Sequence, residues 1–314
     1  MTNKESTREV SGKSLLELGA LHSNLVVLGG DLNKSTFANL FGDEYPTRFF
    51  DFGPSEQNII SAAAGMASCG KIPVVSTFAV FATSRPCDQL RVNVSQPGLN
   101  VKVVATHSGI VTGEDGISAH SIEVIAIMCA LPGFTVVVPS DATETEQVMR
   151  VAIETNGPFY IRLSRPATPV IHDKTNTFTL GKAEILQEGA DVSIIACGIM
   201  VSTALNAAKE LECSHGIKCK VINMATLKPI DEEAILSSAK ETGAIVTAEE
   251  HYKFGGLTSI VSQIVSGGTP VPIESVALEG YTESGSPDQL LTKYNLSTED
   301  IIKAVHKVVA RKQP

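Results

Sequence analysis

The chain has 314 residues, of which 43% are hydrophobic and 19% are charged, and its formal net charge is −9. This length exceeds what one hydrophobic core usually fills, so we expect two domains. The composition is that of a folded globular protein. Net negative charge without a dense Lys/Arg block argues against nucleic acid or an anionic membrane as the main partner.

Neither the cysteine spacing nor the N-terminal segment indicates a secreted protein. Cysteines without C-x-x-C spacing and without the density of a small disulfide-rich domain are expected to be reduced thiols. The first residues, MTNKESTREVSGK, lack the apolar core of a signal peptide, and no apolar run reaches the roughly 18 residues of a membrane span. We therefore expect a cytoplasmic protein. The six cysteines are Cys69, Cys87, Cys129, Cys197, Cys213 and Cys219.

The first half of the chain alternates between short apolar runs rich in β-branched residues and longer runs of helical period. This alternation predicts a parallel sheet, and strands so uniformly apolar are expected to be covered on both faces. Asp141 and Glu144, after Pro139, have the spacing of a helix capping box. Strands are predicted at 24–30, 72–78, 101–107, 134–140 and 158–164, and helices at 55–70, 121–131 and 141–155.

A connector rich in threonine and proline follows, PATPVIHDKTNTFTLGK at 166–182. Such a run suits a link between domains, and we place the boundary near Asp173. The first domain is then 1–173, and a second, smaller doubly wound α/β domain is 174–314. Its strands are predicted at 191–198, 218–224, 244–250 and 272–278, with helices that begin near 201, 231 and 257.

Glu56, in Gly53-Pro54-Ser55-Glu56, lies at a junction between a loop and a predicted helix. In a site sheltered from water, this carboxylate would be able to hydrogen-bond a ring nitrogen of a bound heterocycle. In an exposed site it would be an ordinary first-turn glutamate, which contributes about 0.3–1 kcal/mol through the helix dipole. The segment alone leaves both interpretations open.

A polar loop of fourteen residues, 107–120, follows the predicted strand at 101–107. Ligands in open α/β sheets bind beyond the carboxyl ends of strands. His107, Asp115 and His120 suit hydrogen bonds to a polyol, whereas their wide spacing disfavours a metal site. Structural roles for both histidines stay open. Arg165, just after the strand at 158–164, is either an anion ligand or a surface ion-pair partner.

Three segments, taken in order, carry a resemblance to a known family. They are GPSEQNIISAAAGMASCGKIPVVSTFAVF at 53–81, ATHSGIVTGEDGISAH at 105–120 and LSRP at 163–166. Together they resemble the pyrimidine-binding domain of the transketolase family. The second half is similar to the C-terminal domain that follows it in the same enzymes.

The resemblance implies a thiamine diphosphate enzyme that passes a two-carbon ketol unit from a ketose phosphate to an aldose phosphate, with the coenzyme as electron sink. It implies that Glu56 binds a nitrogen of the aminopyrimidine ring, that Phe78 stacks on this ring and that Phe81 packs nearby. The catalytic residues implied are Glu56, His107 and His120. The substrate-binding residues implied are Arg8, Ser35, His107, Asp115, His120 and Arg165, of which Arg8, Ser35 and Arg165 hold the sugar phosphate.

The sequence departs from the family pattern in two places. Ser84 stands where a further aromatic residue is usual near the pyrimidine. The family's Thr-His-Gln after the acidic loop is Ala119-His120-Ser121 here. These changes bear on coenzyme stacking and on the acceptor sugar.

A GDG motif followed some 25–30 residues later by Asn, which in this family holds magnesium and the diphosphate, is not found in the 314 residues. The resemblance therefore implies the C-terminal half of a split transketolase. Its N-terminal partner subunit would carry the GDG…N motif and the magnesium ligands, so none is expected here. The expected assembly is a two-plus-two heterotetramer in the pentose phosphate pathway.

Two other interpretations stay open. One is a subunit of another thiamine enzyme, either a 2-oxoacid dehydrogenase E1 β subunit or half of a deoxyxylulose-phosphate synthase. His107 argues against the synthase, whose corresponding place resembles an aspartate, and the dehydrogenase β subunits lack the GEDG…H run seen here at 113–120. The other is a non-catalytic regulatory partner that kept the fold. In the second domain, Glu249, Glu250, His251 and Tyr252 end a predicted strand, and we expect them to make buried polar or subunit contacts rather than to catalyse.

Overall fold

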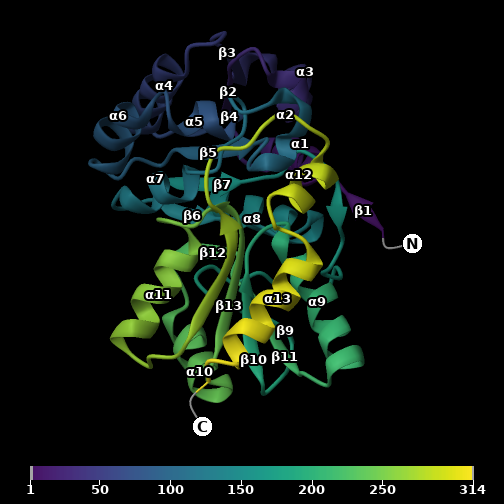
Figure 1. The fold of residues 1–314 in the computed structure, drawn as a ribbon. Helices are drawn as coiled ribbons and strands as arrows, with labels where there is room; N and C mark the ends of the chain where they lie inside the picture. The colour runs from purple at the N-terminus through teal and green to yellow at the C-terminus, as the bar shows by residue number, and fades with distance from the viewer. Residues whose placement is uncertain (1–2, 313–314) are drawn as a thin grey trace.

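The computed structural model describes residues 3–312 and contains two α/β units, one above the other in Figure 1. The upper unit is built on a seven-stranded sheet whose strand order is β12-β6-β7-β5-β4-β2-β3. Every neighbouring pair is parallel except β12 and β6. The strands are β2 (Leu25–Gly29), β3 (Phe49–Asp51), β4 (Ile72–Phe78), β5 (Lys102–Thr106), β6 (Thr135–Val137), β7 (Phe159–Arg162) and β12 (Thr226–Lys228).

Helices cover both faces of this sheet, as the apolar strands predict. Alternate residues of β2 show the two faces, because Val26 and Leu28 pack with α4 and α7 while Leu25 and Val27 pack with α1 and α8. The helices are α1 (Thr7–Leu21), α2 (Asn33–Thr36), α3 (Asn39–Glu44), α4 (Glu56–Ser68), α5 (Ala79–Thr83), α6 (Cys87–Gln89), α7 (Val124–Ala130) and α8 (Ala142–Glu154). Non-α helical segments are the 3-10 helices η1 (Pro46–Arg48) and η3 (Ile110–Asp115) and the π-helical segment η2 (Leu90–Ser95).

The start of α8 shows how the sequence sets a boundary. The Asp141 side chain accepts a hydrogen bond from the Glu144 amide at 2.8 Å, which satisfies a free donor of the first turn. The Glu144 carboxylate accepts from the Ser140 amide at 2.7 Å rather than from the cap residue itself. The predicted capping box is thus present in a modified form. The helix predicted from 121 begins only at Val124, because Ser121 forms a bridge with Gly109.

The lower unit contains a five-stranded sheet of order β14-β13-β10-β11-β9, in which only the edge strand β9 is antiparallel. Its strands are β9 (Glu184–Gln187), β10 (Val192–Ala196), β11 (Cys219–Asn223), β13 (Ile245–Tyr252) and β14 (Ile273–Leu278). Its helices are α9 (Met200–His215), α10 (Glu232–Thr242), α11 (Leu257–Gly267), α12 (Pro287–Lys293) and α13 (Thr298–Val309). The prediction of two doubly wound α/β domains is confirmed.

The two units are joined by a strand, by an apolar cluster and by a small strand pair. The β12 strand, from the second half of the chain, pairs with β6 of the first sheet. One apolar cluster runs from α4 and α7 of the upper unit to α10 and α11 of the lower unit. A small antiparallel pair of β1 (Lys4–Glu5) and β8 (Thr168–Pro169) ties the N-terminal segment to the connector. The boundary near Asp173 stays a prediction, and β12 lies on the far side of it.

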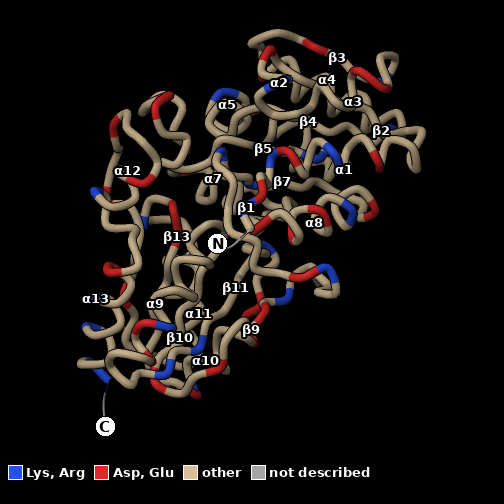
Figure 2. The backbone as a smooth tube through the Cα atoms, turned by 90° about the vertical axis from the view of Figure 1, so that its right-hand side faces the viewer, with Lys and Arg blue, Asp and Glu red and all other residues tan. Residues whose placement is uncertain are grey.

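Charged residues of both signs are interspersed along both units in Figure 2. In residues 3–312, no helix is both long and apolar enough to cross a membrane.

Candidate active site at the carboxyl edge of the first sheet

The predicted site residues follow the carboxyl ends of neighbouring parallel strands. Arg165 follows β7, His107 follows β5, Phe78 ends β4 and Ser35 follows β2. Glu56 comes after the edge strand β3 and begins α4. Because the carboxyl ends of parallel strands meet at one edge of a sheet, these residues share the edge at which ligands bind in such folds.

Glu56 is buried, with 6% of its surface exposed, and it lines a cavity of about 650 Å³. Its carboxylate Oε1 accepts a hydrogen bond from Arg85 Nη1 at 2.8 Å. The Arg85 guanidinium carbon also lies 4.2 Å from the centre of the Phe81 ring. A flat hydrogen-bond donor therefore already rests against both Glu56 and the Phe81 ring.

The buried Phe78 ring stacks with two other rings. The His107 ring lies parallel to it with centroids 3.6 Å apart, and the Phe81 ring stacks on it with centroids 5.9 Å apart. Phe81 is only partly buried. One face of the Phe81 ring thus lies against Arg85, which lines the Glu56 cavity, whereas Phe78 stacks on His107.

His107 adopts a left-handed backbone conformation, with φ of 55°. Its Nδ1 lies 2.9 Å from the Thr106 hydroxyl, and its carbonyl accepts a hydrogen bond from the Thr112 hydroxyl at 2.6 Å. Burial, together with the positive charges of Arg8 and Arg165, lowers the pKa of His107 to about 3. The imidazole is therefore neutral at physiological pH and is able to accept or donate a hydrogen bond.

Two arginines meet beside His107. Arg8 Nε donates to the Arg165 carbonyl at 3.0 Å, and Arg8 Nη1 donates to the Ser35 carbonyl at 2.6 Å. Burial, and then the charge of Arg165, lowers the pKa of Arg8. The two positive charges thus act on each other, and an anion bound near both would be stabilised by charge-assisted hydrogen bonds. Arg8 lies in the first turn of α1, although its position near the terminus would by itself suggest an unstructured residue.

Asp115 lies at the rim of this arginine pair. Its Oδ1 is 3.9 Å from Arg165 Nη2, while Glu114 Oε2 is 3.1 Å from Arg165 Nη1. Arg165 therefore makes the ion pair that we considered from sequence, and it does so inside the candidate site.

His120 is buried and held from two sides. Its Nε2 lies 3.0 Å from the Gly113 carbonyl, and its Nδ1 lies 2.7 Å from the hydroxyl of Thr282. Burial lowers the pKa of His120. Nε2 is thus the nitrogen that donates, to Gly113. Thr282 belongs to the second half of the chain.

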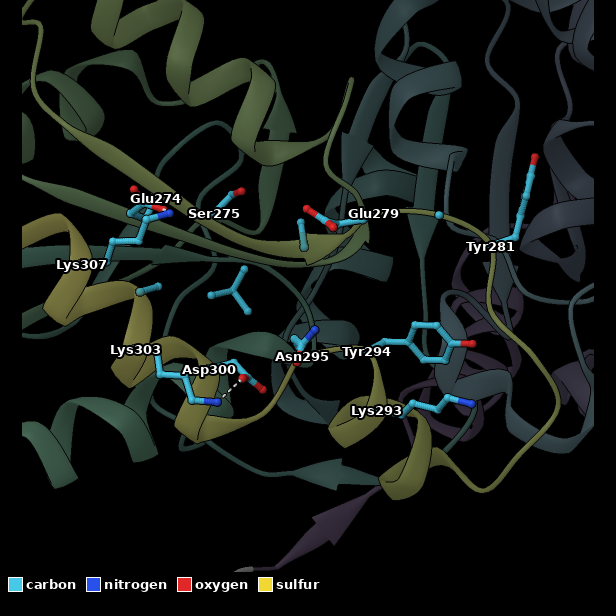
Figure 3. Close-up of a pocket in the computed structure, with 14 residues that line it drawn as sticks. Glu274, Ser275, Glu279, Tyr281, Lys293, Tyr294, Asn295, Asp300, Lys303 and Lys307 are labelled. Carbon is cyan, nitrogen blue, oxygen red and sulfur yellow. Dashed lines mark hydrogen bonds and ion pairs between the residues drawn. The ribbon is translucent and has the colours of Figure 1, made fainter.

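No group of three or more His, Cys, Asp or Glu side chains in residues 3–312 is arranged to hold a metal ion. Another cavity, of about 560 Å³, lies between β14 and α13 (Figure 3). Its residues all come from the second half of the chain, and two of its lysines pair with acids, Lys303 with Asp300 and Lys307 with Glu274. It contains none of the predicted site residues.

Sequence reasoning missed two residues of the site. Arg85 directly follows Ser84, so the Ser-Arg pair in the place of the usual aromatic residue was a usable signal. Thr282 is 162 positions away from His120 and left no signal in the sequence.

Both halves of the chain match known protein families. Residues 3–170 match the family model "Transketolase, pyrimidine binding domain", and residues 181–301 match "Transketolase, C-terminal domain". Among relatives, the chain is 42% identical to a putative transketolase C-terminal section of Methanocaldococcus jannaschii, over 95% of this chain and 94% of the relative. It is 41% identical to a 6-deoxy-6-sulfo-D-fructose transketolase subunit of a Clostridium species, over 95% and 92%.

A solved structure titled "Split gene transketolase, inactive beta4 tetramer" shares 44% identity and a TM-score of 0.92, over 98% of this chain and 99% of that one. The chain is also 35% identical to mouse transketolase, but it spans only 50% of that protein's length.

Proposed function

The chain belongs to the transketolase family, and we propose that it is the C-terminal subunit of a split transketolase that works with thiamine diphosphate. The observation that carries this proposal is the buried Glu56 carboxylate, which lines a cavity at the same sheet edge as the Arg8 and Arg165 pair. The relatives matched along nearly their whole length are named as transketolase sections or subunits. They do not favour the oxoacid dehydrogenase or deoxyxylulose-phosphate synthase interpretations.

The residues fit the aminopyrimidine end of the coenzyme. Arg85 shows that the Glu56 carboxylate and the Phe81 face together accept a planar nitrogen donor. The Glu56 carboxylate would accept a hydrogen bond from a ring nitrogen in its protonated form, and Phe81 would stack on the ring, which adds about 0.5–1.5 kcal/mol. We therefore transfer to Phe81 the stacking role expected of Phe78. When bound, the coenzyme supplies the electron sink for cleavage of a carbon–carbon bond.

The substrate end is formed by the remaining residues. Arg8 and Arg165, with Ser35 beside them, would hold the sugar phosphate through charge-assisted hydrogen bonds. His107, neutral because of burial and the arginines, would bond a sugar hydroxyl and is suited to take up or release a proton there. Asp115 at the rim and the buried His120 would contact further hydroxyls.

The diphosphate and magnesium would be held by an N-terminal subunit that bears the GDG…N motif. We propose two copies of each subunit, acting on sugar phosphates of the pentose phosphate pathway in the cytoplasm. The relative described as an inactive tetramer of β chains is consistent with a subunit that needs a partner.

The test is reconstitution with the N-terminal subunit, thiamine diphosphate and magnesium, followed by an assay of ketol transfer between sugar phosphates. The wild-type complex should be active and the chain alone inactive. Glu56→Ala should reduce kcat at least about 100-fold, because the general acid–base step is lost. Glu146→Ala, on the exposed face of α8, is the matched control and should leave kcat unchanged. Unchanged turnover in Glu56→Ala would instead indicate a non-catalytic subunit.

A further inference from the structure

A buried carboxylate of the second half of the chain lies against the loop that carries the candidate site. Glu250, near the end of β13, is 2% exposed. Its Oε1 accepts a hydrogen bond from the Val111 amide at 2.7 Å, across 139 positions of sequence. Val111 lies in η3, between His107 and Asp115. The second domain thus contacts the backbone of the substrate loop, which we define as residues 107–116.

The substrate loop is shaped to receive this carboxylate. Gly109 has φ of 76°, and a Cβ atom placed on it would lie 2.1 Å from the Glu250 carboxylate. No larger residue fits there without moving Glu250 or the loop. Gly109 therefore provides both the left-handed backbone and the space for the carboxylate.

A single arginine joins Glu250 to the first sheet. Arg162 of β7 is buried and donates from Nη2 to the Glu250 carbonyl at 2.8 Å, and the same nitrogen is 3.8 Å from Glu250 Oε2. Arg162 lies three residues before Arg165. Arg162, the last residue of β7, thus links the strand that precedes Arg165 to the residue whose carboxylate holds the loop.

Residues 111–113, next to the Glu250 carboxylate, also form hydrogen bonds with three candidate site residues. The Thr112 hydroxyl donates to the His107 carbonyl, and Arg165 Nη1 donates to the Thr112 carbonyl at 2.5 Å. The Gly113 carbonyl lies 3.0 Å from His120 Nε2. A displacement of residues 110–113 would therefore move the contacts of all three site residues together.

We propose that Glu250 is a positioning residue through which the second domain fixes the conformation of the substrate loop. Burial raises the pKa of Glu250 to about 7, against the opposing effects of Arg162 and the Val111 and Ile110 amides. A side-chain oxygen accepts a hydrogen bond in the charged and in the neutral form. Glutamine at this position should therefore preserve the contact with the loop.

The neighbouring Glu249 provides a matched control. It is equally buried, but successive strand residues point to opposite faces. Its carboxylate accepts from the Leu257 and Thr258 amides at 2.7 and 2.8 Å, at the start of α11, so its hydrogen bonds go to α11 and not to the loop. A change at Glu249 perturbs the same strand without touching the substrate loop.

The test is hydrogen exchange of backbone amides in the full chain, which needs neither coenzyme nor partner subunit. Glu250→Ala should accelerate exchange in residues 109–113 at least tenfold, whereas Glu250→Gln should stay within about threefold of wild type. Glu249→Ala should accelerate exchange at residues 257–260 and leave the loop protected. Loop exchange in Glu250→Ala that equals wild type, or that rises only as part of uniform acceleration along the chain, would overturn the proposal.

A kinetic readout rests on the proposed function. In the reconstituted complex, Glu250→Ala should raise KM for the sugar phosphate about tenfold more than Glu249→Ala does, with partial rescue by Glu250→Gln. If no variant and no wild-type complex shows ketol transfer, the proposed function fails while the exchange result still decides the role of Glu250. Equal KM values in the two alanine variants would contradict positioning.

Discussion

Arg85 and the proposed coenzyme are alternative partners of the Glu56 carboxylate. The Arg85 guanidinium bonds one of the two carboxylate oxygens of Glu56, Oε1, and lies over the Phe81 ring. The coenzyme ring would need both of these surfaces. In the proposed binding mode Arg85 would leave the Phe81 ring when the coenzyme binds, and the free energy of the Glu56–Arg85 pair would oppose binding.

The solvent exposure of Arg85 limits how strongly the ion pair opposes coenzyme binding. The Arg85 side chain is 51% exposed, so solvent screens the pair, and such pairs contribute about 0–1 kcal/mol. Arg85→Met should therefore lower the apparent Kd for thiamine diphosphate in the reconstituted complex by no more than about fivefold, as measured by coenzyme titration of activity. Weaker coenzyme binding by Arg85→Met would show instead that Arg85 contacts the bound coenzyme.

His107 gives a second prediction at this scale. Because burial and two arginines lower the pKa of His107 to about 3, its imidazole should not titrate between pH 5 and 9. The ring-proton resonances of His107 in NMR spectra of the full chain should stay constant over that range. In the urea-unfolded chain they should titrate near the ordinary value of about 6.5. A folded-state midpoint above pH 5 would refute this prediction.

At the scale of elements, a buried ion cluster joins the start of α8, the connector and β9. His172 Nδ1 lies 3.1 Å from Asp141 Oδ2, and His172 Nε2 lies 2.9 Å from Glu184 Oε2. The Asp141 carboxylate also caps α8 and accepts from the Ile171 and His172 amides. One helix cap therefore also fixes the path of the connector.

This cluster predicts a pH-dependent stability. Burial opposes the charge of His172, but the hydrogen bond to Asp141 and the nearby carboxylates raise its pKa to about 9. Its contribution, on the order of 3 kcal/mol, should be fully present below pH 6.5 and should disappear as the pH rises through about 9. The difference in unfolding free energy between wild type and His172→Gln, measured by urea titration, should shrink over this range. A difference that grows with pH would contradict the assignment.

The long apolar strands and the Asp141 cap were predictable because local pattern determines them. Runs such as 72–78 and 101–107 are apolar enough to identify a buried strand. The short strands β3, β9 and β12 were not predicted, because FFD, EILQ and TLK include charged residues and, unlike the equally short β6 and β7, do not lie in longer apolar runs. The roles of Thr282 and Glu250 were hidden for a different reason: each contact joins residues more than 100 positions apart. Arg8 and Ser35 were predicted as site residues only from the resemblance to the transketolase family.

For the whole molecule, the shared apolar cluster and β12 determine how the chain should unfold. The apolar contacts continue from α4 and α7 to α10 and α11, so we expect neither unit to unfold before the other. Calorimetry of the full chain should therefore show a single cooperative transition. Residues 1–173 alone should melt at least about 5 °C lower, because β6 loses β12 and keeps only β7 as a neighbour. Adding residues 174–314 as a separate polypeptide should restore part of the loss. Two separate transitions in the full chain would show that the units are independent.

The β12 pairing also limits how related enzymes can be recombined. A chimera that joined the first unit of one homologue to the second unit of another would place a foreign strand at the border of the first sheet. Ala225, which accepts from the Val138 amide at 2.7 Å, and Lys228, whose ammonium group bonds the Cys129 carbonyl at the end of α7, would have to suit their new neighbours. Segments 129–138 and 225–228 should therefore be inherited together, wherever the crossover point is placed.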